Sequence, residues 1–341
     1  MSRNYFITGG AGFIGSNYVS RLLERGEKVT IFDNLSRAGA PRNLAWLQEK
    51  FGGTAFRLTV GDVRDAALLE ASSRAADVII HLAGQVAVTT SVVNPREDFE
   101  INAQGTFNVL EAARLNERKP IILYASTNKV YGGMEDVKVV EDATRWRYAD
   151  LPLGCPETQP LDFHSPYGCS KGSGDQYVHY YSRIYGLPSV VLRQSCIYGP
   201  RQFGVEDQGW VAWMIIAAVT GRQLTIYGDG KQIRDVLHVD DLLNAYDTAI
   251  ARIDRVKGQI YNLGGGPENT MSIWTEFGPL LEKLLGKPVP VARGDWRPGD
   301  QKVFVADIRK AGRELGWKPK VGVEEGVGRL FEWVRENMDL F

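Results

Sequence analysis

Two residues separated by about one helical turn carry the clearest chemical signal in the chain. Tyr167 and Lys171 stand four positions apart in a stretch with a helical pattern, and this spacing puts both side chains on one helix face. A tyrosine with its ordinary pKa of about 10 is a poor base at neutral pH. A neighbouring ammonium stabilises the phenolate and lowers that pKa. We therefore predict that Tyr167 is a general acid–base and that Lys171 assists it.

A hydroxyl group is the third member of this predicted catalytic set. Thr127 closes the sequence Ala125-Ser126-Thr127, directly after the apolar run 121–124. If that run is a strand, the hydroxyl lies at the edge of a cleft and can hydrogen-bond the reacting oxygen of a substrate. A Tyr-x-x-x-Lys pair alone is common by chance, and a plain surface pair is the alternative.

A glycine turn near the start of the chain predicts a dinucleotide site. The apolar run 5–8 leads into Gly9, Gly12 and Gly15, and a helical pattern continues to about residue 25. Such a turn brings the backbone close to a pyrophosphate, which the N–H groups of the helix N-terminus can bind. The alternative is a glycine turn without a ligand.

The residue that ends the second apolar run indicates which dinucleotide would bind. Asp33 lies 18 residues after Gly15, where a carboxylate can accept hydrogen bonds from the adenosine ribose. It would repel a 2′-phosphate, so NAD is favoured over NADP. The nearby Arg37 keeps NADP open.

The elements that must position these residues alternate in type along the first half of the chain. Helical patterns separate most of the expected strands, which are 5–8, 28–32, 56–60, 78–82, 121–124 and 189–193. Near-continuous apolar strands alternating with helices are typical of a parallel sheet covered on both faces. We predict an α/β fold with a doubly wound parallel (Rossmann) sheet.

The second half is less regular, and its aromatic and glycine clusters predict a smaller, discontinuous α/β domain for substrate binding. We place the NAD-binding domain at 1–193 with 235–262, and the substrate-binding domain at 194–234 with 263–341. A substrate cleft is expected at the carboxyl ends of the strands, facing this smaller part.

The composition excludes several classes of partner. The chain has 341 residues, of which 44% are hydrophobic and 24% charged, with a net charge of −1. This balance argues against nucleic acid or a membrane as a partner. We found neither a secretory signal nor the roughly 18 apolar residues of a membrane span, so we expect a cytoplasmic protein. Three cysteines and four histidines match no zinc spacing, so no metal is expected.

Short motifs spread over nearly the whole chain are shared with one known family. They are the glycine turn, Asp33, Asp62-Val63, His81-Leu82-Ala83-Gly84, Ser126-Thr127, Val130-Tyr131-Gly132, the Tyr167 and Lys171 pair, Tyr198-Gly199-Pro200 and the run 228–236. Together they resemble the extended short-chain dehydrogenase/reductases that act on sugar nucleotides. The resemblance implies tightly bound NAD that is recycled within the catalytic cycle, and a homodimer or homotetramer.

The resemblance also implies where the ligands bind. The predicted cofactor-binding residues are Gly9, Gly12, Phe13, Ile14, Gly15, Asp33, Asn34, Asp62, Val63, Leu82, Ala83, Gly84, Tyr167 and Lys171. The predicted substrate-binding residues are Gln85, Thr127, Asn128, Ser195, Arg201, Gln208, Arg234 and Arg297. Among these, Arg234 and Arg297 would clamp the substrate diphosphate, because a guanidinium suits a phosphate better than an ammonium does.

Residues after Thr127 help to separate the branches of this family. The 4,6-dehydratases place an Asp-Glu pair there and the decarboxylases usually keep the glutamate, whereas this chain has Asn128-Lys129. The segments 84–91, 126–132, 161–171, 202–203, 207–211 and 301–307 resemble instead the branch that inverts C2 of CDP-paratose to give CDP-tyvelose. Lys302 departs from that pattern, where an arginine is expected.

On this interpretation the substrate is a CDP-sugar and the reaction is redox-neutral. Tyr167 takes the proton of the C2 hydroxyl, Thr127 orients that oxygen, and a transient 2-keto sugar turns before it is reduced on its other face. Two alternatives stay open. One is a sugar-nucleotide 4-epimerase acting on a UDP or CDP hexose, and the other is a non-catalytic NAD-binding sensor, although such sensors often lack the tyrosine or the lysine.

Overall fold

The computed structural model describes residues 2–297 and 300–341, which divide into two compact units. Unit 1 comprises Met1–Val130, Ser165–Arg193 and Ala245–Tyr261, and unit 2 comprises Tyr131–His164, Gln194–Asn244 and Asn262–Phe341. The expected domain boundaries assign 131–164 and 235–244 to the NAD-binding domain, whereas contacts within the chain group both segments with unit 2. Residues 139–148 contain a two-stranded hairpin of their own, a feature that the sequence did not indicate.

A seven-stranded sheet organises the first unit. Its strand order is β13 (Ile260–Leu263), β8 (Ser189–Gln194), β5 (Ile121–Thr127), β4 (Val78–His81), β1 (Asn4–Thr8), β2 (Lys28–Asp33) and β3 (Arg57–Val60). The pairs from β5 through β3 are all parallel. From β1 the chain continues to β2 and β3 on one side of β1, and it then crosses to β4 on the other side. The strand order therefore reverses between β1 and β4. In such folds ligands bind at that reversal. The prediction of a doubly wound parallel sheet is confirmed.

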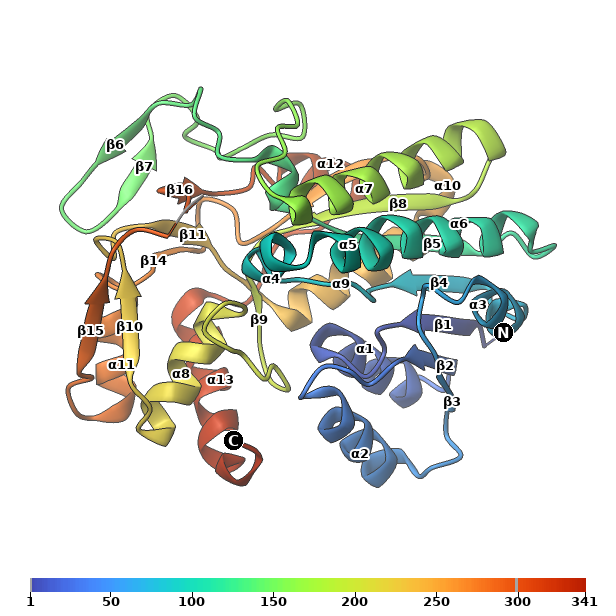
Figure 1. Cartoon of the computed structure of the whole chain (residues 1–341), viewed down its shortest axis with the longest axis horizontal. Helices are drawn as coiled ribbons and strands as arrows, with labels where there is room; N and C mark the ends of the chain where they lie inside the picture. Colours follow the sequence, from blue (N-terminus) through green and yellow to red (C-terminus); the bar gives the residue numbers. More distant parts are fainter. Residues whose placement is uncertain (1, 298–299) are drawn as a thin grey trace. The chain divides into compact units, whose positions relative to one another are not determined.

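Helices cover both faces of this sheet (Figure 1). On one face lie α1 (Phe13–Glu24) and α2 (Ala40–Phe51), and on the other lie α3 (Ala66–Ser73), α6 (Gly105–Leu115) and α7 (Pro166–Tyr185). Strand side chains on one face of the sheet, including Phe6, Ile79 and Ile122, are buried in one core with residues of α3, α6 and α7. The runs that form β1, β4 and β8 are therefore strands buried on both faces, as parallel sheets require, whereas the edge strand β3 is partly exposed.

Three details of local structure position the predicted catalytic residues. Helix α7 begins where the Ser165 side chain accepts a hydrogen bond from the Gly168 backbone N–H at 3.0 Å, which satisfies a free donor of the first turn. It ends at Gly186, whose φ of +66° suits a left-handed cap. Strand β5 is three residues longer than expected, so Thr127 is its last residue rather than a residue after it.

An irregular helical segment precedes α6. The chain forms α4 (Val88–Val93), α5 (Pro95–Phe99) and a π-helical turn, η1 (Glu100–Gln104), before α6 starts. The sequence has a helical pattern over 102–115, of which residues 102–104 belong to the π-helical turn and 105–115 to α6. Turns of this π-helical kind occur frequently at functional sites.

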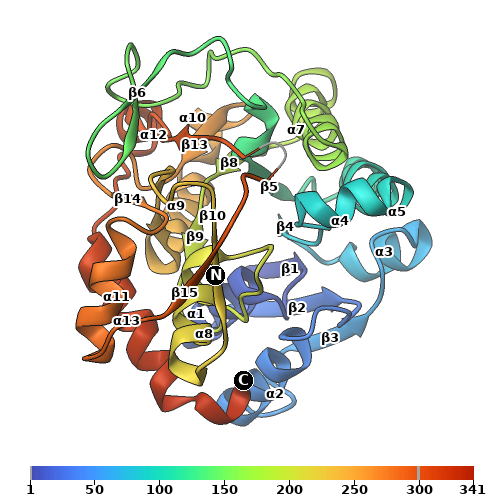
Figure 2. The same cartoon turned by 60° about the vertical axis from the view of Figure 1, so that its left-hand side comes forward.

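The second unit is built from short strands around a separate core (Figure 2). Its small sheets are β10 (Leu224–Tyr227) with β15 (Val291–Gly294), β11 (Ile233–Asp235) between β14 (Thr270–Ser272) and β16 (Val303–Phe304), β9 (Ile197–Tyr198) with β12 (Leu237–His238), and β6 (Val139–Glu141) with β7 (Trp146–Tyr148). Helices α8 (Trp210–Thr220), α11 (Phe277–Leu285) and α13 (Val323–Glu336) supply most of that core.

The remaining helical segments are short or connect the elements above. They are η2 (Asn128–Tyr131), α9 (Val239–Ala251), α10 (Ile253–Val256), α12 (Arg309–Leu315) and η3 (Met338–Leu340). None of the helices in the described part of the chain combines the length and hydropathy needed to span a bilayer. Within the same ranges, no three His, Cys, Asp or Glu side chains converge as a metal site.

Candidate active site

Tyr167 and Thr127 meet in the interior of the first unit. Tyr167 is buried in the first turn of α7, and its backbone N–H donates to the Ser91 hydroxyl at 3.1 Å. Burial is the largest influence on the phenol and raises its pKa to about 12, while a hydrogen bond with Thr127 opposes that rise. The sequence predicts a lowered pKa here. The protein groups around Tyr167 do not produce it, because desolvation of the phenolate outweighs them.

Lys171 lies one turn further along the same helix and is also buried. Its Nζ stands 4.3 Å from the centre of the Tyr124 ring. Burial lowers the pKa of this ammonium to about 7, and the charges of Asp175 and Asp98 oppose the fall. Lys171 therefore exchanges between charged and neutral forms near neutral pH, which makes its charge sensitive to nearby carboxylates.

A buried ion pair ties α7 to the neighbouring strands. Asp175 accepts two hydrogen bonds from the Arg193 guanidinium, both at 2.9 Å, and a third from the Ser126 hydroxyl at 2.7 Å. The exposed fractions of the Arg193 and Asp175 side chains are 3% and 0%. The bidentate geometry satisfies both oxygens of the carboxylate. Since Ser126 precedes Thr127, this network fixes β5 and β8 against the catalytic helix.

A second polar network lies behind Lys171 and was not predicted from the sequence. Asn102, in the π-helical turn η1, donates to Asp98 Oδ1 at 3.0 Å and accepts from the Gln85 backbone N–H at 2.9 Å. The Asn102 side-chain nitrogen also lies 3.2 Å from the Ser170 hydroxyl. Gln85, a predicted substrate-binding residue, directs its Nε2 to the carbonyl of Ala87 at 2.8 Å. No local pattern in the sequence indicates this network, because its residues come from η1, α5 and the segment after β4.

The glycine turn has the shape that a dinucleotide site requires. A Cβ atom on Gly15 would lie 2.2 Å from the Gly9 carbonyl oxygen, and one on Gly9 would lie 2.8 Å from the Ala83 nitrogen. Gly12 is the N-cap of α1, so Phe13 and Ile14 open the helix without a side-chain cap. The first N–H groups of α1 are therefore left to bind an anion.

Asp33 organises this turn from the end of β2. It is buried, its Oδ2 accepts from the Ala11 backbone N–H at 3.0 Å, and its Oδ1 accepts from the Leu35 N–H at 2.8 Å. Burial raises the pKa of the carboxyl, and both hydrogen bonds oppose the rise. A carboxylate has about four acceptor positions, so capacity remains for ribose hydroxyls.

The other predicted adenine-side residues have clear partners. Asn34 donates to Asp62 at 2.9 Å, and Arg64 holds the same carboxylate through two oxygens at 2.8 and 2.9 Å. The Arg64 guanidinium keeps the pKa of Asp62 well below its usual range. Val63 is buried in the core.

The segment after β4 stands beside both the glycine turn and Lys171. The backbone N–H groups of Leu82 and Ala83 donate to the carbonyl and the hydroxyl of Thr8 at 3.1 and 3.2 Å. A Cβ on Gly84 would lie 2.9 Å from Asn102 Oδ1 and 4.0 Å from Lys171 Nζ. The absence of a side chain at Gly84 therefore keeps the approach to Lys171 open.

The remaining predicted substrate residues lie in the second unit. Arg297 stacks over the Tyr227 ring at 3.8 Å and pairs with Asp207 at 3.3 Å and Glu206 at 3.6 Å. Arg234 is buried, donates to the carbonyl of Ile233 at 2.8 Å and lies 3.8 Å from Asp300.

The other three predicted residues of this unit have structural contacts. Ser195 donates to the buried Asp235 at 2.6 Å, and Gln208 forms a backbone bridge with Val205. The guanidinium of Arg201 lies 5.6 Å from the centre of the Trp333 ring.

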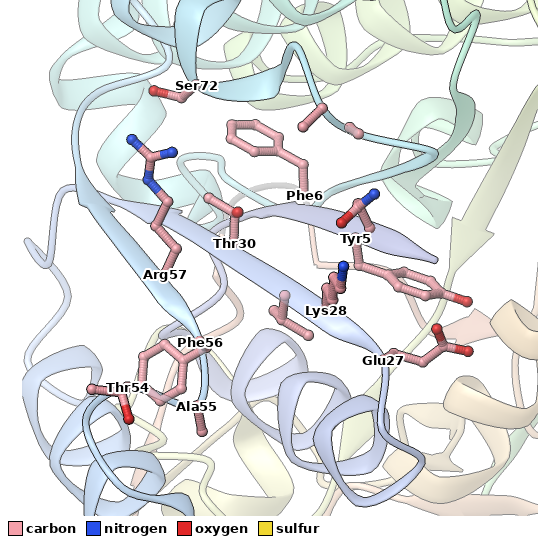
Figure 3. Close-up of a pocket in the computed structure, with 14 residues that line it drawn as sticks. Tyr5, Phe6, Glu27, Lys28, Thr30, Thr54, Ala55, Phe56, Arg57 and Ser72 are labelled. Atoms are coloured by element: carbon pink, nitrogen blue, oxygen red, sulfur yellow. The ribbon is translucent and has the colours of Figure 1, made fainter. Parts of the chain in front are cut away.

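A hollow of about 540 Å³ with mixed polar and apolar lining lies elsewhere in the first unit, at the amino ends of β1, β2 and β3 (Figure 3). In a parallel sheet this edge is opposite the one that holds Gly9 and Asp33. None of the predicted site residues lines it, and its charged side chains are Lys28, Arg57 and Glu27. The predicted catalytic residues Thr127, Tyr167 and Lys171 therefore lie outside this hollow.

Comparison with known proteins agrees with this geometry. A model of the family described as GDP-mannose 4,6 dehydratase matches residues 6–330. The chain belongs to this family of extended short-chain dehydrogenase/reductases. The CDP-paratose 2-epimerase of Salmonella typhi is 46% identical over 335 residues, which are 96% of this chain and 98% of that protein.

Two solved structures of the same fold are also similar. The UDP-glucose 4-epimerase of Thermotoga maritima, crystallised with UDP-glucose, superposes with a TM-score of 0.84 at 30% identity, over 98% of this chain and 99% of that one. The dTDP-glucose 4,6-dehydratase DesIV of Streptomyces venezuelae, with NAD and TYD bound, gives 0.84 at 30% identity, over 99% and 98%.

Within the dehydrogenase/reductase family, the residues after Thr127 restrict the chemistry. Asn128 is buried and its side-chain oxygen accepts from the Thr127 hydroxyl at 3.3 Å, while the Lys129 backbone N–H donates to that hydroxyl at 3.2 Å. An amide and an ammonium occupy the positions at which a dehydratase needs carboxyl groups. Beside the predicted catalytic residues Thr127, Tyr167 and Lys171, these two positions therefore hold no carboxyl pair for removing water.

Proposed function

We propose that this protein is an NAD-dependent sugar-nucleotide epimerase that inverts C2 of CDP-paratose to give CDP-tyvelose. The observation that carries the proposal is the 46% identity to CDP-paratose 2-epimerase over 96% of the chain. The site supports it, because Tyr167, Thr127 and Lys171 are buried together and the residues after Thr127 lack a dehydratase pair.

NAD fits the residues of the first unit. The N–H groups of α1 and the bare backbone of Gly9, Gly12 and Gly15 would bind the pyrophosphate, and Asp33 would bind the adenosine ribose. Lys171 would bind the nicotinamide ribose beside Gly84. Bound NAD⁺ would accept a hydride from C2 and return it, and its positive ring would lower the pKa of Tyr167 where the protein alone does not.

The protein's own groups move and hold the proton. Tyr167 Oη accepts the proton of the substrate C2 hydroxyl and returns it after the sugar has turned. The Thr127 hydroxyl hydrogen-bonds the same oxygen and fixes its position. Proton transfer by a placed side chain contributes about 10² to 10⁴ in rate. In the second unit, Arg234 and Arg297 would bind the diphosphate of the substrate, and a 2-keto sugar is the transient intermediate.

A single incubation tests the proposal. Purified protein is mixed with CDP-paratose without added NAD, and the sugar is followed by NMR. Formation of CDP-tyvelose establishes C2 inversion and shows that NAD stays bound and is recycled. If conversion needs added NAD, inversion stands and tight binding is wrong. If nothing converts with NAD present, the assignment of the substrate is wrong.

A second candidate is a 4-epimerase of a UDP or CDP hexose. It is favoured by the structural likeness to UDP-glucose 4-epimerase over 98% of the chain. The two activities need nearly the same catalytic groups and differ in the sugar pocket. A panel of CDP-paratose, CDP-glucose and UDP-glucose, followed by NMR, separates the two activities. Only the true substrate is converted, and its inverted centre is C2 for the first activity and C4 for the second.

We also propose that the protein is a homodimer or homotetramer assembled through α6 and α7. Large apolar side chains on these helices are exposed, namely Phe107, Tyr177, Tyr180, Ile184 and Tyr185. An apolar patch of this kind marks an interaction surface. Replacing Phe107 and Ile184 by glutamate should shift the mass measured by light scattering to that of a monomer, and an unchanged mass would place the interface elsewhere.

A cytoplasmic location is proposed as well. None of Cys155, Cys169 and Cys196 is joined in a disulfide, as is usual in a reducing compartment. Cell fractionation tests this, and recovery from an oxidising compartment would contradict it.

A further inference from the structure

The second polar network contains an acid with an unused oxygen. Asp98, in α5, is 1% exposed, and its Oδ1 accepts the hydrogen bond from Asn102 at 3.0 Å. Its Oδ2 is buried without a hydrogen-bond partner among residues 2–297 and 300–341. The Ser170 hydroxyl, which lies near this carboxylate, donates to the Tyr167 carbonyl at 3.2 Å. A buried polar atom left unpaired is costly and requires a reason.

The position of Asp98 beside the catalytic helix supplies that reason. Asn102, which binds Asp98, also lies 3.2 Å from Ser170, the residue before Lys171. The same Asn102 side chain and Lys171 Nζ both border Gly84. Asp98 and Lys171 are thus both buried around the Asn102 side chain, and the charge of each favours the charge of the other, because an interaction between buried charges is weakly screened.

The charges around Lys171 leave Asp98 as its counterion. His81 is buried and uncharged at neutral pH, because burial lowers its pKa to about 3, and the ring of Tyr124 is neutral. Asp175 has the larger individual effect on Lys171, but its charge is already countered by Arg193 at 2.9 Å on both oxygens. Of the described groups that influence Lys171, Asp98 is the carboxylate that forms no ion pair with an arginine.

We propose that Asp98 is a positioning residue of the reaction, whose buried carboxylate keeps Lys171 charged and holds it in place beside Tyr167. The proposal rests on the proposed function for its link to catalysis. Its consequence is that the charge of Lys171 depends on α5 as well as on its own helix. Without Asp98, Asp175 is the described carboxylate left to oppose the loss of charge that burial causes at Lys171, and Arg193 already neutralises Asp175.

The direct test follows the ionisation of Lys171 itself. Lysine labelled with ¹³C at Cε is incorporated, the Lys171 resonance is assigned by its loss in Lys171→Arg, and its shift is followed against pH. In the wild type the pKa is expected at about 7. Asp98→Asn, which keeps the shape and removes the charge, should lower that midpoint by about one pH unit. Glu117→Gln, at an exposed carboxylate, should leave it unchanged.

Kinetics provide the second readout. If Lys171 must be charged, the alkaline loss of kcat in Asp98→Asn moves to lower pH by about one unit and the two enzymes converge on the acid side. At pH 7 the charged fraction of Lys171 falls from about one half in the wild type to about one tenth when the midpoint is one unit lower. The expected loss of kcat at pH 7 is therefore about fivefold. KM should be unchanged. A purely structural role for Asp98 would lower kcat by the same factor at every pH.

The outcomes separate this inference from the proposed function. An unchanged Lys171 midpoint in Asp98→Asn overturns the role of Asp98, even if CDP-paratose is converted. A lowered midpoint in a protein that converts no CDP-paratose supports the charge interaction and overturns only the substrate. If Asp98→Asn does not fold, Asp98→Ser replaces it. The wild type offers a further check through ¹³C-labelled aspartate, since a protonated Asp98 at pH 7 would overturn the inference without any variant.

Discussion

The Ser126 hydroxyl donates to the Asp175 carboxylate at 2.7 Å in the interior of the first unit. One residue beyond Ser126 is Thr127, and one helical turn before Asp175 is Lys171. The contact therefore joins the strand that ends at Thr127 to the helix that carries Tyr167 and Lys171, the other two residues of the predicted catalytic set. Arg193 closes the group from β8 and neutralises Asp175.

Breaking this ion pair should destabilise the fold strongly. Arg193→Met leaves Asp175 buried and uncompensated, which costs about 3–5 kcal/mol in the free energy of unfolding. The double variant Arg193→Met, Asp175→Leu should recover much of that loss because no buried charge remains. Denaturant unfolding measures both. Arg335→Met, at an exposed pair with Glu332, is the control and should cost at most about 1 kcal/mol.

Removing the phenol of Tyr167 should abolish most turnover and leave NAD in place. In Tyr167→Phe the ring still fills its buried site, so the loss reports proton transfer, and kcat should fall by about 10² to 10⁴. Bound NAD is measured by absorbance after protein denaturation. Tyr177→Phe, at an exposed position of the same helix, serves as the control. Full activity in Tyr167→Phe would remove the general acid–base from the mechanism.

The parts of the fold that the sequence predicts are those with local signals. Gly9, Gly12 and Gly15 show their role through spacing alone, and the strands through short apolar runs between helices. The first unit also contains β13, which was not among the expected strands. This strand, 260–263, has only four residues before the glycines at 264–266. So short an apolar run cannot be distinguished from a turn in the sequence.

The supporting residues of the site have no such signal. Asp175 and Arg193 are 18 positions apart, and each alone resembles a surface charge. Their pairing exists only because β8 and α7 pack together. Asn102 lies in a π-helical turn that no periodicity indicates, and its contacts with Asp98 and Ser170 exist only in the folded chain. The raised pKa of Tyr167 was also beyond prediction, because it depends on burial, which is a property of the assembled fold.

The glycine turn should tolerate no side chain at its last position. In Gly15→Ala the new Cβ would lie 2.2 Å from the Gly9 carbonyl oxygen, with backbone atoms of Gly10 also within 3 Å. The turn must shift, so we expect lost NAD binding and a lower unfolding temperature. Gly53→Ala introduces a Cβ into open space and should change neither. Isothermal titration with NAD measures the difference, and normal affinity in Gly15→Ala would show that the turn does not hold the pyrophosphate.

Arg297 should contribute to substrate affinity in competition with its acidic neighbours. Its guanidinium pairs with Asp207 at 3.3 Å and Glu206 at 3.6 Å. If it binds the diphosphate, Arg297→Ala raises KM about tenfold or more, since a charged hydrogen bond is worth about 1.5–3 kcal/mol. Asp207→Asn removes a competitor and should lower KM. Arg335→Ala is the control, and an unchanged KM in Arg297→Ala would place the diphosphate elsewhere.

The burial of Lys171 should make the protein less stable than a variant without that charge. Its pKa is about 7 in the folded state and 10.5 as the ordinary value, so the unfolded chain binds more protons between these limits. The penalty is therefore complete below pH 7 and fades as pH rises to 10.5. Lys171→Met should be inactive yet more stable by roughly 2–4 kcal/mol at pH 7, given about 1.4 kcal/mol per pKa unit and the loss of a partner for Asp98. The gain should shrink steadily towards pH 10 in denaturant titrations, while Lys318→Met, at an exposed lysine, shows no such trend. A gain that stays constant with pH would mean that packing rather than charge sets the difference.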